Sequence, residues 1–296
     1  MNYDFIIDSK NINKMVSYYH NYLEDLSDTR IMYSFKSQDF KITIYNTKKV
    51  LFQGKKSFEE YEKWAKVFAL DIPKPIDYHN NDNLYLKQRI IGSDEVGTGD
   101  FFGPVVVCAA YCRPNDLKLV QELKIQDSKN INDKKIRELG EILIDKFSYH
   151  VLVLPPKKYN ELVQKGYNLN KIKAFLHNHA IKKMVDKNPS YQNVILDQFC
   201  SPTNYFNYLG GEETFKNIKF HTKAESIHPA VAIASIIARY KFLLEMDSLS
   251  DNTGITLPKG AGPGVDAIGK LIYLKHGKSI FENIAKVNFK NIERIL

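Results

Sequence analysis

The sequence predicts an α/β protein in which a small α-β-β-β-α domain precedes a larger domain built on a mixed sheet flanked by helices. Three observations support this prediction. Apolar residues near the N-terminus recur at helical spacing and are followed by three short runs rich in strand-forming residues. A pair of prolines and a polar stretch then interrupt the pattern near residue 80. Beyond them, runs of strand length alternate with helical patterns, which is typical of a sheet covered by helices.

Size and composition narrow the class of protein further. A chain of 296 residues with 44% hydrophobic and 26% charged residues is large enough for about two domains and is not disordered throughout. Three cysteines without a Cys-x-x-Cys pair exclude a disulfide framework and give no zinc-binding pattern. The longest uncharged apolar runs have 12 residues, fewer than the roughly 20 that a membrane-spanning helix needs. We therefore expect a cytoplasmic protein without membrane association.

The charge of the chain is positive and unevenly distributed. The formal net charge is +8, and residues 1–80 hold 12 Lys and Arg against 11 Asp and Glu, while the rest of the chain holds 30 against 23. A basic second segment favours a polyanionic partner such as a nucleic acid. A general enrichment in lysine explains the same numbers equally well, so charge alone does not decide between the two interpretations.

The elements of the first domain follow from periodicity. Apolar side chains fall on one face at i, i+3/4 and i+7 spacing from about Asn11 to Leu26, which predicts an amphipathic helix ended by Asp28. Gaps of about four residues then separate three short strands, a spacing that suits antiparallel hairpins. These strands are expected at Ile31–Phe35, Phe40–Tyr45 and Val50–Phe52.

A second helix and a linker complete this part of the chain. Ser57 and Glu60 form the sequence pattern of a capping box, which predicts a helix start. Its inward face is expected to carry Phe58, Tyr61, Ala65 and Phe68. The prolines and polar residues that follow place the domain boundary between Lys74 and Lys87. The predicted organisation is a first domain at 1–74, a linker at 75–87 and a second domain at 88–296.

The second domain is expected to alternate strands and helices around one sheet. Asn132 is a natural N-cap for a helix that begins at Asp133. The long apolar run that begins at Ile227 predicts a buried helix. In chain order, the expected elements are strands Ile90–Asp94 and Pro104–Tyr111, helix Asp133–Phe147, strand Tyr149–Leu154, helix Lys171–Val185, strands Val194–Asp197 and Ile218–Thr222, and helix Ile227–Met246.

The first candidate site lies where an apolar strand runs into two adjacent carboxylates, Asp94 and Glu95, followed by Gly97-Thr98-Gly99. Adjacent side chains of a strand point to opposite faces, so both acids can serve one site only if the strand ends or twists at Glu95. The glycines permit such a bend. An exposed turn with solvated acids explains this segment about as well.

Two further carboxylates stand in similar places. Asp197 ends an apolar strand, at the edge where α/β sheets gather their functional residues. Glu225 follows another strand directly before the long helix, with Ser226 as a candidate cap. A turn aspartate and a glutamate that stabilises a helix N-terminus are the structural alternatives. His228 could approach the same place, but a structural role is favoured for it.

Four carboxylates that converge would repel one another unless cations neutralise them. Oxygen ligands without the Cys and His spacing of a zinc site point to Mg²⁺ or Mn²⁺. Two such ions about 4 Å apart are a standard device for attack on a phosphodiester. Together, the acids and the basic second domain favour a metal-dependent enzyme that acts on nucleic acid.

Several sequence blocks carry a family resemblance. The main block is Gly92-Ser-Asp-Glu-Val-Gly-Thr-Gly-Asp-Phe-Phe-Gly-Pro104, and the others are Asp127-Ser-Lys129, Ile195-Leu-Asp-Gln-Phe199, Lys223-Ala-Glu-Ser226, Ala234-Ser-Ile-Ile-Ala-Arg-Tyr240 and Leu257-Pro-Lys-Gly-Ala-Gly262. In this order they resemble the type 2 ribonucleases H, in the ribonuclease HIII branch. The resemblance covers about residues 88–265. The segment before it resembles the TATA-binding-protein-like (TBP-like) substrate-binding domain of that branch.

The resemblance implies a ribonuclease H-like catalytic domain that hydrolyses the RNA strand of RNA–DNA hybrids and leaves 5′-phosphate and 3′-hydroxyl ends. It also implies that Asp94, Glu95, Asp197 and Glu225 bind two Mg²⁺ or Mn²⁺ ions, with Asp94 shared by both. We expect the protein to act as a monomer on this nucleic-acid substrate.

Two departures from the ribonuclease HII pattern favour the HIII branch. The sister family has Gly-Arg-Gly where this chain has Gly97-Thr98-Gly99, and Asp where this chain has Glu225. This implies a preference for stretches of ribonucleotides over a single ribonucleotide in DNA. Because glycine has no Cβ, this backbone can approach a ribose closely, and the 2′-hydroxyl distinguishes RNA from DNA. Ser128 and Lys129 are expected to contact phosphate, although a solvated loop explains them too.

Two other functions remain open at this stage. One is cleavage at single ribonucleotides in DNA, as in ribonuclease HII. The other is hybrid binding without catalysis, against which the retained carboxylates argue, because unused acids only weaken binding to phosphates. His177 and His179 lie two positions apart on a predicted helix and cannot share a metal, so packing or surface roles are expected for both. Cys108 and Cys112 share one strand face and are expected in the core.

Overall fold

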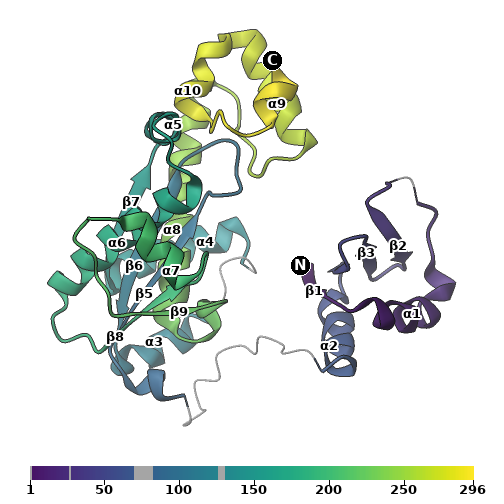
Figure 1. The fold of residues 1–296 in the computed structure, drawn as a ribbon, viewed down its shortest axis with the longest axis horizontal. Coiled ribbons are helices and arrows are strands. Elements are labelled where there is room, and N and C mark those ends of the chain that lie inside the picture. Colours follow the sequence, from purple (N-terminus) through teal and green to yellow (C-terminus); the bar gives the residue numbers. More distant parts are fainter. Residues whose placement is uncertain (1, 27, 70–82, 126–130) are drawn as a thin grey trace. The chain divides into compact units, whose positions relative to one another are not determined.

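Figure 1 shows the fold of the chain in a computed structural model that describes residues 2–26, 28–69, 83–125 and 131–296. The chain divides into two compact units, Met1–Pro73 and Lys74–Leu296. Among the described residues, none of the helices is both long enough and apolar enough to cross a membrane.

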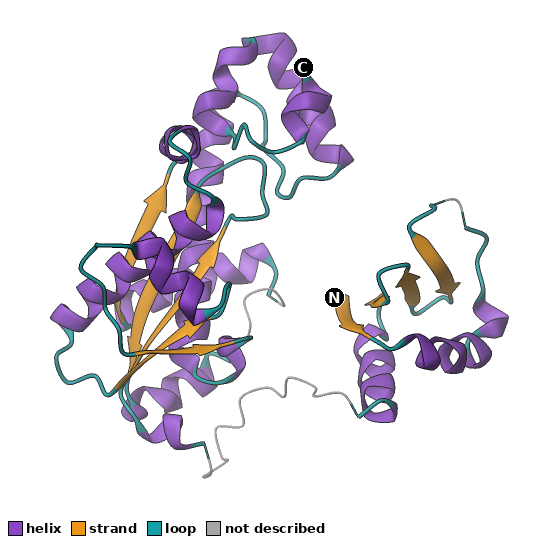
Figure 2. Cartoon of the chain, viewed as in Figure 1, coloured by secondary structure: helices purple, strands orange, loops and turns teal. Residues whose placement is uncertain are grey.

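The first unit is a four-stranded antiparallel sheet with two helices (Figure 2). Its strand order is β1-β4-β3-β2. The elements are β1 (Asn2–Ile6), α1 (Ser9–Tyr18), β2 (Ile31–Lys36), β3 (Lys41–Tyr45), β4 (Lys49–Gln53) and α2 (Ser57–Val67). The small antiparallel domain is confirmed, with one strand more than the sequence analysis expected. β1 pairs with β4 along its whole length, from Asn2 opposite Gln53 to Ile6 opposite Lys49.

Local details of the first unit differ from the prediction. α1 ends at Tyr18 rather than near Leu26, and Leu23 forms a β-bridge with Phe35. The Ser57–Glu60 capping box does not form, because the helix is preceded by Lys56 and no side chain caps it. Glu60 instead accepts a hydrogen bond from the Tyr19 hydroxyl.

The inward face of α2 also differs from the expected one. Phe58 is 44% exposed, whereas Trp64, which was not assigned to the core, is only 4% exposed. Trp64 Nε1 donates to the Tyr19 hydroxyl at 2.6 Å. A tryptophan therefore connects α2 to the end of α1, where Tyr19 is also buried.

The second unit is a mixed five-stranded sheet covered by helices, as the sequence predicted. The strand order is β7-β6-β5-β8-β9; β5, β6 and β7 pair antiparallel, while β5 with β8 and β8 with β9 pair parallel. Its elements are β5 (Ile90–Val96), β6 (Val105–Cys112), α3 (Leu117–Glu122), α4 (Asp133–Lys146), β7 (Ser148–Leu154), α5 (Pro156–Gln164), α6 (Leu169–Lys187), β8 (Asn193–Asp197), α7 (Pro202–Leu209), β9 (Ile218–His221), α8 (Pro229–Thr253), α9 (Pro263–His276), α10 (Phe281–Ile284) and α11 (Asn291–Ile295).

The two faces of this sheet are covered by different helices. On one face, Val106, Cys108 and Ile195 pack with α8 and α4. On the other, Val107 and Leu196 pack with α6 and α7. Alternate residues of each strand therefore face different helices, which decides where each acidic side chain points.

α8 lies unusually close to β5 because the strand carries a glycine there. A Cβ built on Gly92 would lie 2.3 Å from the Val231 nitrogen and 2.4 Å from the Ala230 carbonyl carbon. Both atoms belong to the first turn of α8, which begins at Pro229. The helix start is thus held against the strand two residues before Asp94.

Residues 83–87, which the sequence analysis assigned to the linker, pack on the second unit. Asn83 Nδ2 donates to the Ile227 carbonyl oxygen at 3.1 Å, and Leu86 is 5% exposed. Leu84–Lys87 form a 3₁₀ helix. The rest of the expected linker, up to residue 82, lies outside the described residues.

A segment near the C-terminus binds the glycine-rich loop that follows β5. We call residues 281–288 the C-terminal strap. Ala285 forms a β-bridge with Phe102, and the Lys286 backbone nitrogen donates to the Phe101 carbonyl oxygen at 2.9 Å. The Lys286 Nζ donates to the carbonyl oxygens of Asp100 and Gly103, at 2.8 Å and 2.6 Å. The strap therefore holds the loop by both its backbone and one buried side chain.

Candidate active site

Three of the four predicted acids lie at one end of the mixed sheet. Ser93 on β5 pairs with Leu196 on the parallel strand β8, so the next residues, Asp94 and Asp197, stand at adjacent positions on the same face. Asp197 also pairs with His221 on β9. Its Oδ1 accepts a hydrogen bond from the Ala224 backbone nitrogen at 2.9 Å. Glu225 follows Ala224 directly, so the turn after β9 brings it to the same end of the sheet.

Asp94 and Glu225 are largely removed from solvent, while Asp197 is half-buried. Asp94 shares its face with Gly92 and pairs with Cys108, both of which lie on the α8 side. Asp94 is 4% exposed and Glu225 is 7% exposed. Asp94 Oδ1 accepts from the Glu95 backbone nitrogen at 2.7 Å. Burial of several carboxylates near one another is costly unless cations neutralise them, which is the electrostatic requirement of a metal site.

The turn before α8 is capped differently from the prediction. Lys223 has a left-handed backbone (φ 55°) and starts the 3₁₀ helix Ala224–Ser226. The Ser226 hydroxyl donates back to the Lys223 carbonyl oxygen at 2.8 Å and does not cap α8. His228 is the N-cap, since its Nδ1 accepts from the Ala230 nitrogen at 3.1 Å. Burial lowers the pKa of His228 to about 3, so a neutral ring fills this structural role.

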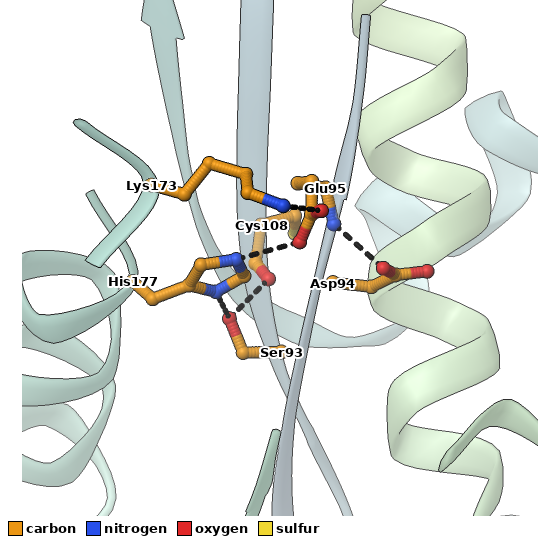
Figure 3. Close-up of polar contacts among 6 residues, drawn as sticks. All are labelled: Ser93, Asp94, Glu95, Cys108, Lys173 and His177. Carbon is orange, nitrogen blue, oxygen red and sulfur yellow. Dashed lines mark hydrogen bonds and ion pairs between the residues drawn. The ribbon is translucent and has the colours of Figure 1, made fainter. Parts of the chain in front are cut away.

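Glu95 points to the other face of the sheet, toward α6 (Figure 3). β5 continues through Val96 without the bend that the sequence analysis required for both acids to serve one site. Its Oε1 lies 2.9 Å from Lys173 Nζ, and its Oε2 lies 2.9 Å from His177 Nε2. Burial would raise the pKa of Glu95, but the hydrogen bond and charge of His177 and the charge of Lys173 lower it to about 2.

Lys173 and His177 were missed by the sequence analysis, which gave His177 only a packing or surface role. Both lie on α6 and are buried, at 7% and 0% exposure. Positions four apart on a helix share one face, so their spacing was a usable signal once the helix had been predicted. His177 Nδ1 lies 2.8 Å from the Ser93 hydroxyl, which also donates to the Cys108 carbonyl oxygen at 2.9 Å. Ser93 thereby anchors the histidine ring to the strand that carries the acids.

Gly97 and Gly99 have different structural roles in the glycine-rich loop. Gly97 has a positive φ of 91°, and a Cβ there would lie 2.2 Å from the Pro104 carbonyl oxygen. Gly97 is therefore required by the fold of the loop. Around Gly99 no described atom lies within 4 Å of an added Cβ, and the residue is exposed. Thr98, between them, is half-buried. The part of the loop open to a ligand is Thr98-Gly99.

Two predicted substrate contacts, Ser128 and Lys129, lie outside the described residues. The helix after them is described and begins as expected, because Asn132 Oδ1 accepts from the Lys135 nitrogen at 2.9 Å. Cys108 and Cys112 are fully buried, which confirms their assignment to the core.

The chemistry of these acidic side chains suits a divalent metal ion, but their arrangement in this structure does not. Asp94, Asp197 and Glu225 offer only carboxylate oxygens, the donors that Mg²⁺ and Mn²⁺ prefer. Among the residues that the structure describes, however, no three His, Cys, Asp or Glu side chains are arranged to hold an ion. Glu95 contributes to this difference, because its carboxylate is bound by Lys173 and His177 on the opposite face.

Two protein-family models match this chain, one in each of its two compact units. Residues 91–292 match the family model of ribonuclease HII. Residues 5–71 match a domain of unknown function (DUF3378).

Comparison with individual proteins identifies the branch. The chain is 42% identical to ribonuclease HIII of Bacillus licheniformis, covering 96% of this chain and 94% of the relative. It is 40% identical to ribonuclease HIII of Phytoplasma mali, covering 99% and 98%. Among solved structures, Bst-RNase HIII in complex with Mn²⁺ is 36% identical with a TM-score of 0.69, covering 100% of this chain and 98% of the other. Two matching sequence domains, relatives across nearly the whole chain and a shared fold therefore show that this chain belongs to the ribonuclease HIII family.

Proposed function

We propose that the protein is a metal-dependent endoribonuclease that hydrolyses the RNA strand of RNA–DNA hybrids and leaves 5′-phosphate and 3′-hydroxyl ends. The observation that carries this proposal is the placement of Asp94, Asp197 and Glu225 at one end of the mixed sheet, in a chain of the ribonuclease HIII family. The net charge of the second domain favours the same class of substrate.

Asp94, Asp197, Glu225 and Glu95 are proposed to hold two Mg²⁺ or Mn²⁺ ions, with Asp94 shared between them. When bound, two such ions lower the pKa of an attacking water and stabilise the leaving 3′ oxygen. The chain contributes the geometry, because the register that pairs Ser93 with Leu196 puts the next residues, Asp94 and Asp197, at adjacent positions. Asp197 is oriented by the Ala224 nitrogen, which also fixes the turn that presents Glu225.

Substrate recognition is assigned to the loop and to the N-terminal domain. Thr98 and Gly99 are proposed to lie against the ribose, with Gly97 setting the turn that exposes them. Ser128 and Lys129 are proposed phosphate contacts. Residues 1–74 are proposed to add affinity for the hybrid as a substrate-binding domain, and the catalytic domain 88–296 is extended at its start by residues 83–87, which pack on it. The protein is proposed to act as a monomer.

A cleavage assay tests this function directly. The purified protein is incubated with a labelled RNA–DNA hybrid and, separately, with a DNA duplex that contains one ribonucleotide, in Mg²⁺ or Mn²⁺. We expect cleavage at several sites of the hybrid, little cleavage of the second duplex, and loss of activity in Asp94→Asn. Efficient cleavage at the single ribonucleotide would instead assign ribonuclease HII-like specificity. Hybrid binding without metal-dependent cleavage would replace the proposal with a binding function.

A further inference from the structure

We propose that Lys173 and His177 are positioning residues that hold the Glu95 carboxylate away from Asp94, and that Glu95 joins the metal site only by exchanging Lys173 for a divalent cation. This inference rests on the proposed function, because it takes Glu95 to be a metal ligand. According to this proposal, contacts with α6 determine when the Glu95 carboxylate is available to bind a metal ion.

Both oxygens of Glu95 are already bound in this structure. Lys173 Nζ donates to Oε1 at 2.9 Å, and His177 Nε2 lies 2.9 Å from Oε2. An ionised carboxylate only accepts hydrogen bonds, so Nε2 carries the proton and donates. Neither oxygen faces Asp94, which lies on the α8 side of the strand (Figure 3). Glu95 therefore has to leave at least one of these donors before it can share an ion with Asp94.

The two donors are held in place by a single aromatic ring. The Lys173 ammonium lies 4.1 Å from the centroid of the Phe199 ring, and the His177 ring stacks on the same ring at 5.3 Å with an interplanar angle of 21°. Ser93 fixes the other nitrogen of His177. Phe199 stands two residues after Asp197, so the end of β8 positions both one proposed metal ligand and the donors that restrain another.

The electrostatics explain why such a restraint is useful. Without a metal ion, a fourth carboxylate beside three others would raise their mutual repulsion, and pairing with Lys173 avoids this. The pair is largely dry, with side-chain exposures of 8% for Lys173 and 12% for Glu95. Separating partners at such a site is unfavourable, so the exchange lowers the affinity of the wild-type protein for metal. Removing Lys173 should therefore tighten metal binding, whereas a lysine that supported the metal-bound geometry would weaken it when removed.

Titration calorimetry with Mn²⁺ and the full-length protein, without substrate, provides the test. We expect Lys173→Met to bind Mn²⁺ about tenfold more tightly than the wild type, and Lys173→Arg to restore an affinity close to the wild type. Lys171→Met is the matched control, since this lysine lies on the same helix with its Nζ 4.1 Å from the Tyr167 ring. It should leave the affinity unchanged. Unchanged or weaker binding by Lys173→Met would overturn the proposal.

A double-mutant cycle separates the exchange from a general effect of charge. Removal of any nearby positive charge would raise the affinity of the site for a cation, but the proposed exchange also requires the Glu95 carboxylate. In a Glu95→Gln background, Lys173→Met should therefore bring no further gain in affinity. A gain as large as in the wild-type background would contradict the proposal. Asp94→Asn tests the site independently: if it binds Mn²⁺ like the wild type, the proposed metal site fails, whatever Lys173 does.

A measurement on the wild-type chain removes any dependence on how the variants fold. In a crystal structure grown with Mn²⁺, the Glu95 carboxylate should face Asp94, with the Lys173 Nζ more than 4 Å away from both its oxygens. Retention of the 2.9 Å contact with the metal bound would refute the exchange.

Discussion

Replacing Lys286 by methionine should abolish a pH dependence of folding stability that the wild-type protein shows above neutral pH. The Lys286 side chain is fully buried, and its ammonium group donates to the carbonyl oxygens of Asp100 and Gly103. Burial lowers the pKa of Lys286 from 10.5 to about 7, although the negative charge of Asp100 opposes this shift. Methionine fills a similar volume and does not titrate.

The sign and size of the effect follow from proton linkage. Because the folded pKa lies below the unfolded one, the unfolded chain binds a proton between pH 7 and 10.5 that the folded chain does not. This contribution to stability is complete above pH 10.5, decreases progressively as the pH falls from 10.5 to 7, and is fully lost below pH 7. One pKa unit corresponds to about 1.4 kcal/mol, so the free energy of unfolding of the wild type relative to Lys286→Met should rise by about 2 kcal/mol from pH 7 to pH 9.

Urea unfolding followed by circular dichroism at pH 7, 8 and 9 measures this difference. Burial also raises the pKa values of Cys108 and Cys112, but both proteins share these residues, so their contribution cancels. Trp64 is the single tryptophan and lies in the first unit, so its fluorescence follows that unit separately and should not respond to the substitution. Stability curves that stay parallel across this pH range would show that Lys286 titrates normally and that the argument from burial is wrong.

Three further outcomes are expected. Gly92→Ala should lower the free energy of unfolding by about 1 to 3 kcal/mol and reduce hybrid cleavage, because the added methyl group would collide with the backbone of Ala230 and Val231. Thermal unfolding measures the loss of stability. Gly211→Ala is the control, because no described atom lies within 4 Å of a Cβ added there. Chelation of divalent ions should abolish cleavage and leave thermal unfolding nearly unchanged, with recovery on adding Mg²⁺ or Mn²⁺; full activity in excess chelator would exclude metal dependence. Deletion of residues 1–74 should raise KM for the hybrid more than it lowers kcat, since the second unit has its own core, and the opposite pattern would contradict a binding role for the first unit.

The placement of Asp94 and Asp197 was predictable because it depends on strand ends. Asp197 ends β8, and Asp94 stands where the pairing of β5 with the parallel strand β8 stops, so both lie at the edge where such sheets gather functional residues. The position of Glu95 depended instead on whether β5 bends after Asp94. Glycines downstream permitted a bend, but pairing with β6 continues through Val96 and keeps the strand straight.

Contacts between segments distant in the sequence explain what the sequence did not reveal. Ser57 and Glu60 match a capping box, yet Glu60 is bound by Tyr19, the residue that follows α1. Lys173 is a charged residue in a buried place, and only the carboxylate it meets 78 positions earlier accounts for that. Local patterns describe single elements well, whereas the partner of a buried polar group is set by the tertiary structure.

The hold of the C-terminal strap on the glycine-rich loop also has a consequence for biosynthesis. Lys286 reaches back across 186 positions to Asp100 and 183 positions to Gly103. At a synthesis rate of about 5 to 20 residues per second, the ribosome needs roughly 10 to 40 s to make the residues that separate them. Until then β5 can pair with β6, but the loop proposed to recognise ribose lacks its anchor. Because Phe281, Ile284 and Ala285 of the strap also belong to the hydrophobic core, the core and the anchored loop are expected to be completed together, after the strap has been synthesised.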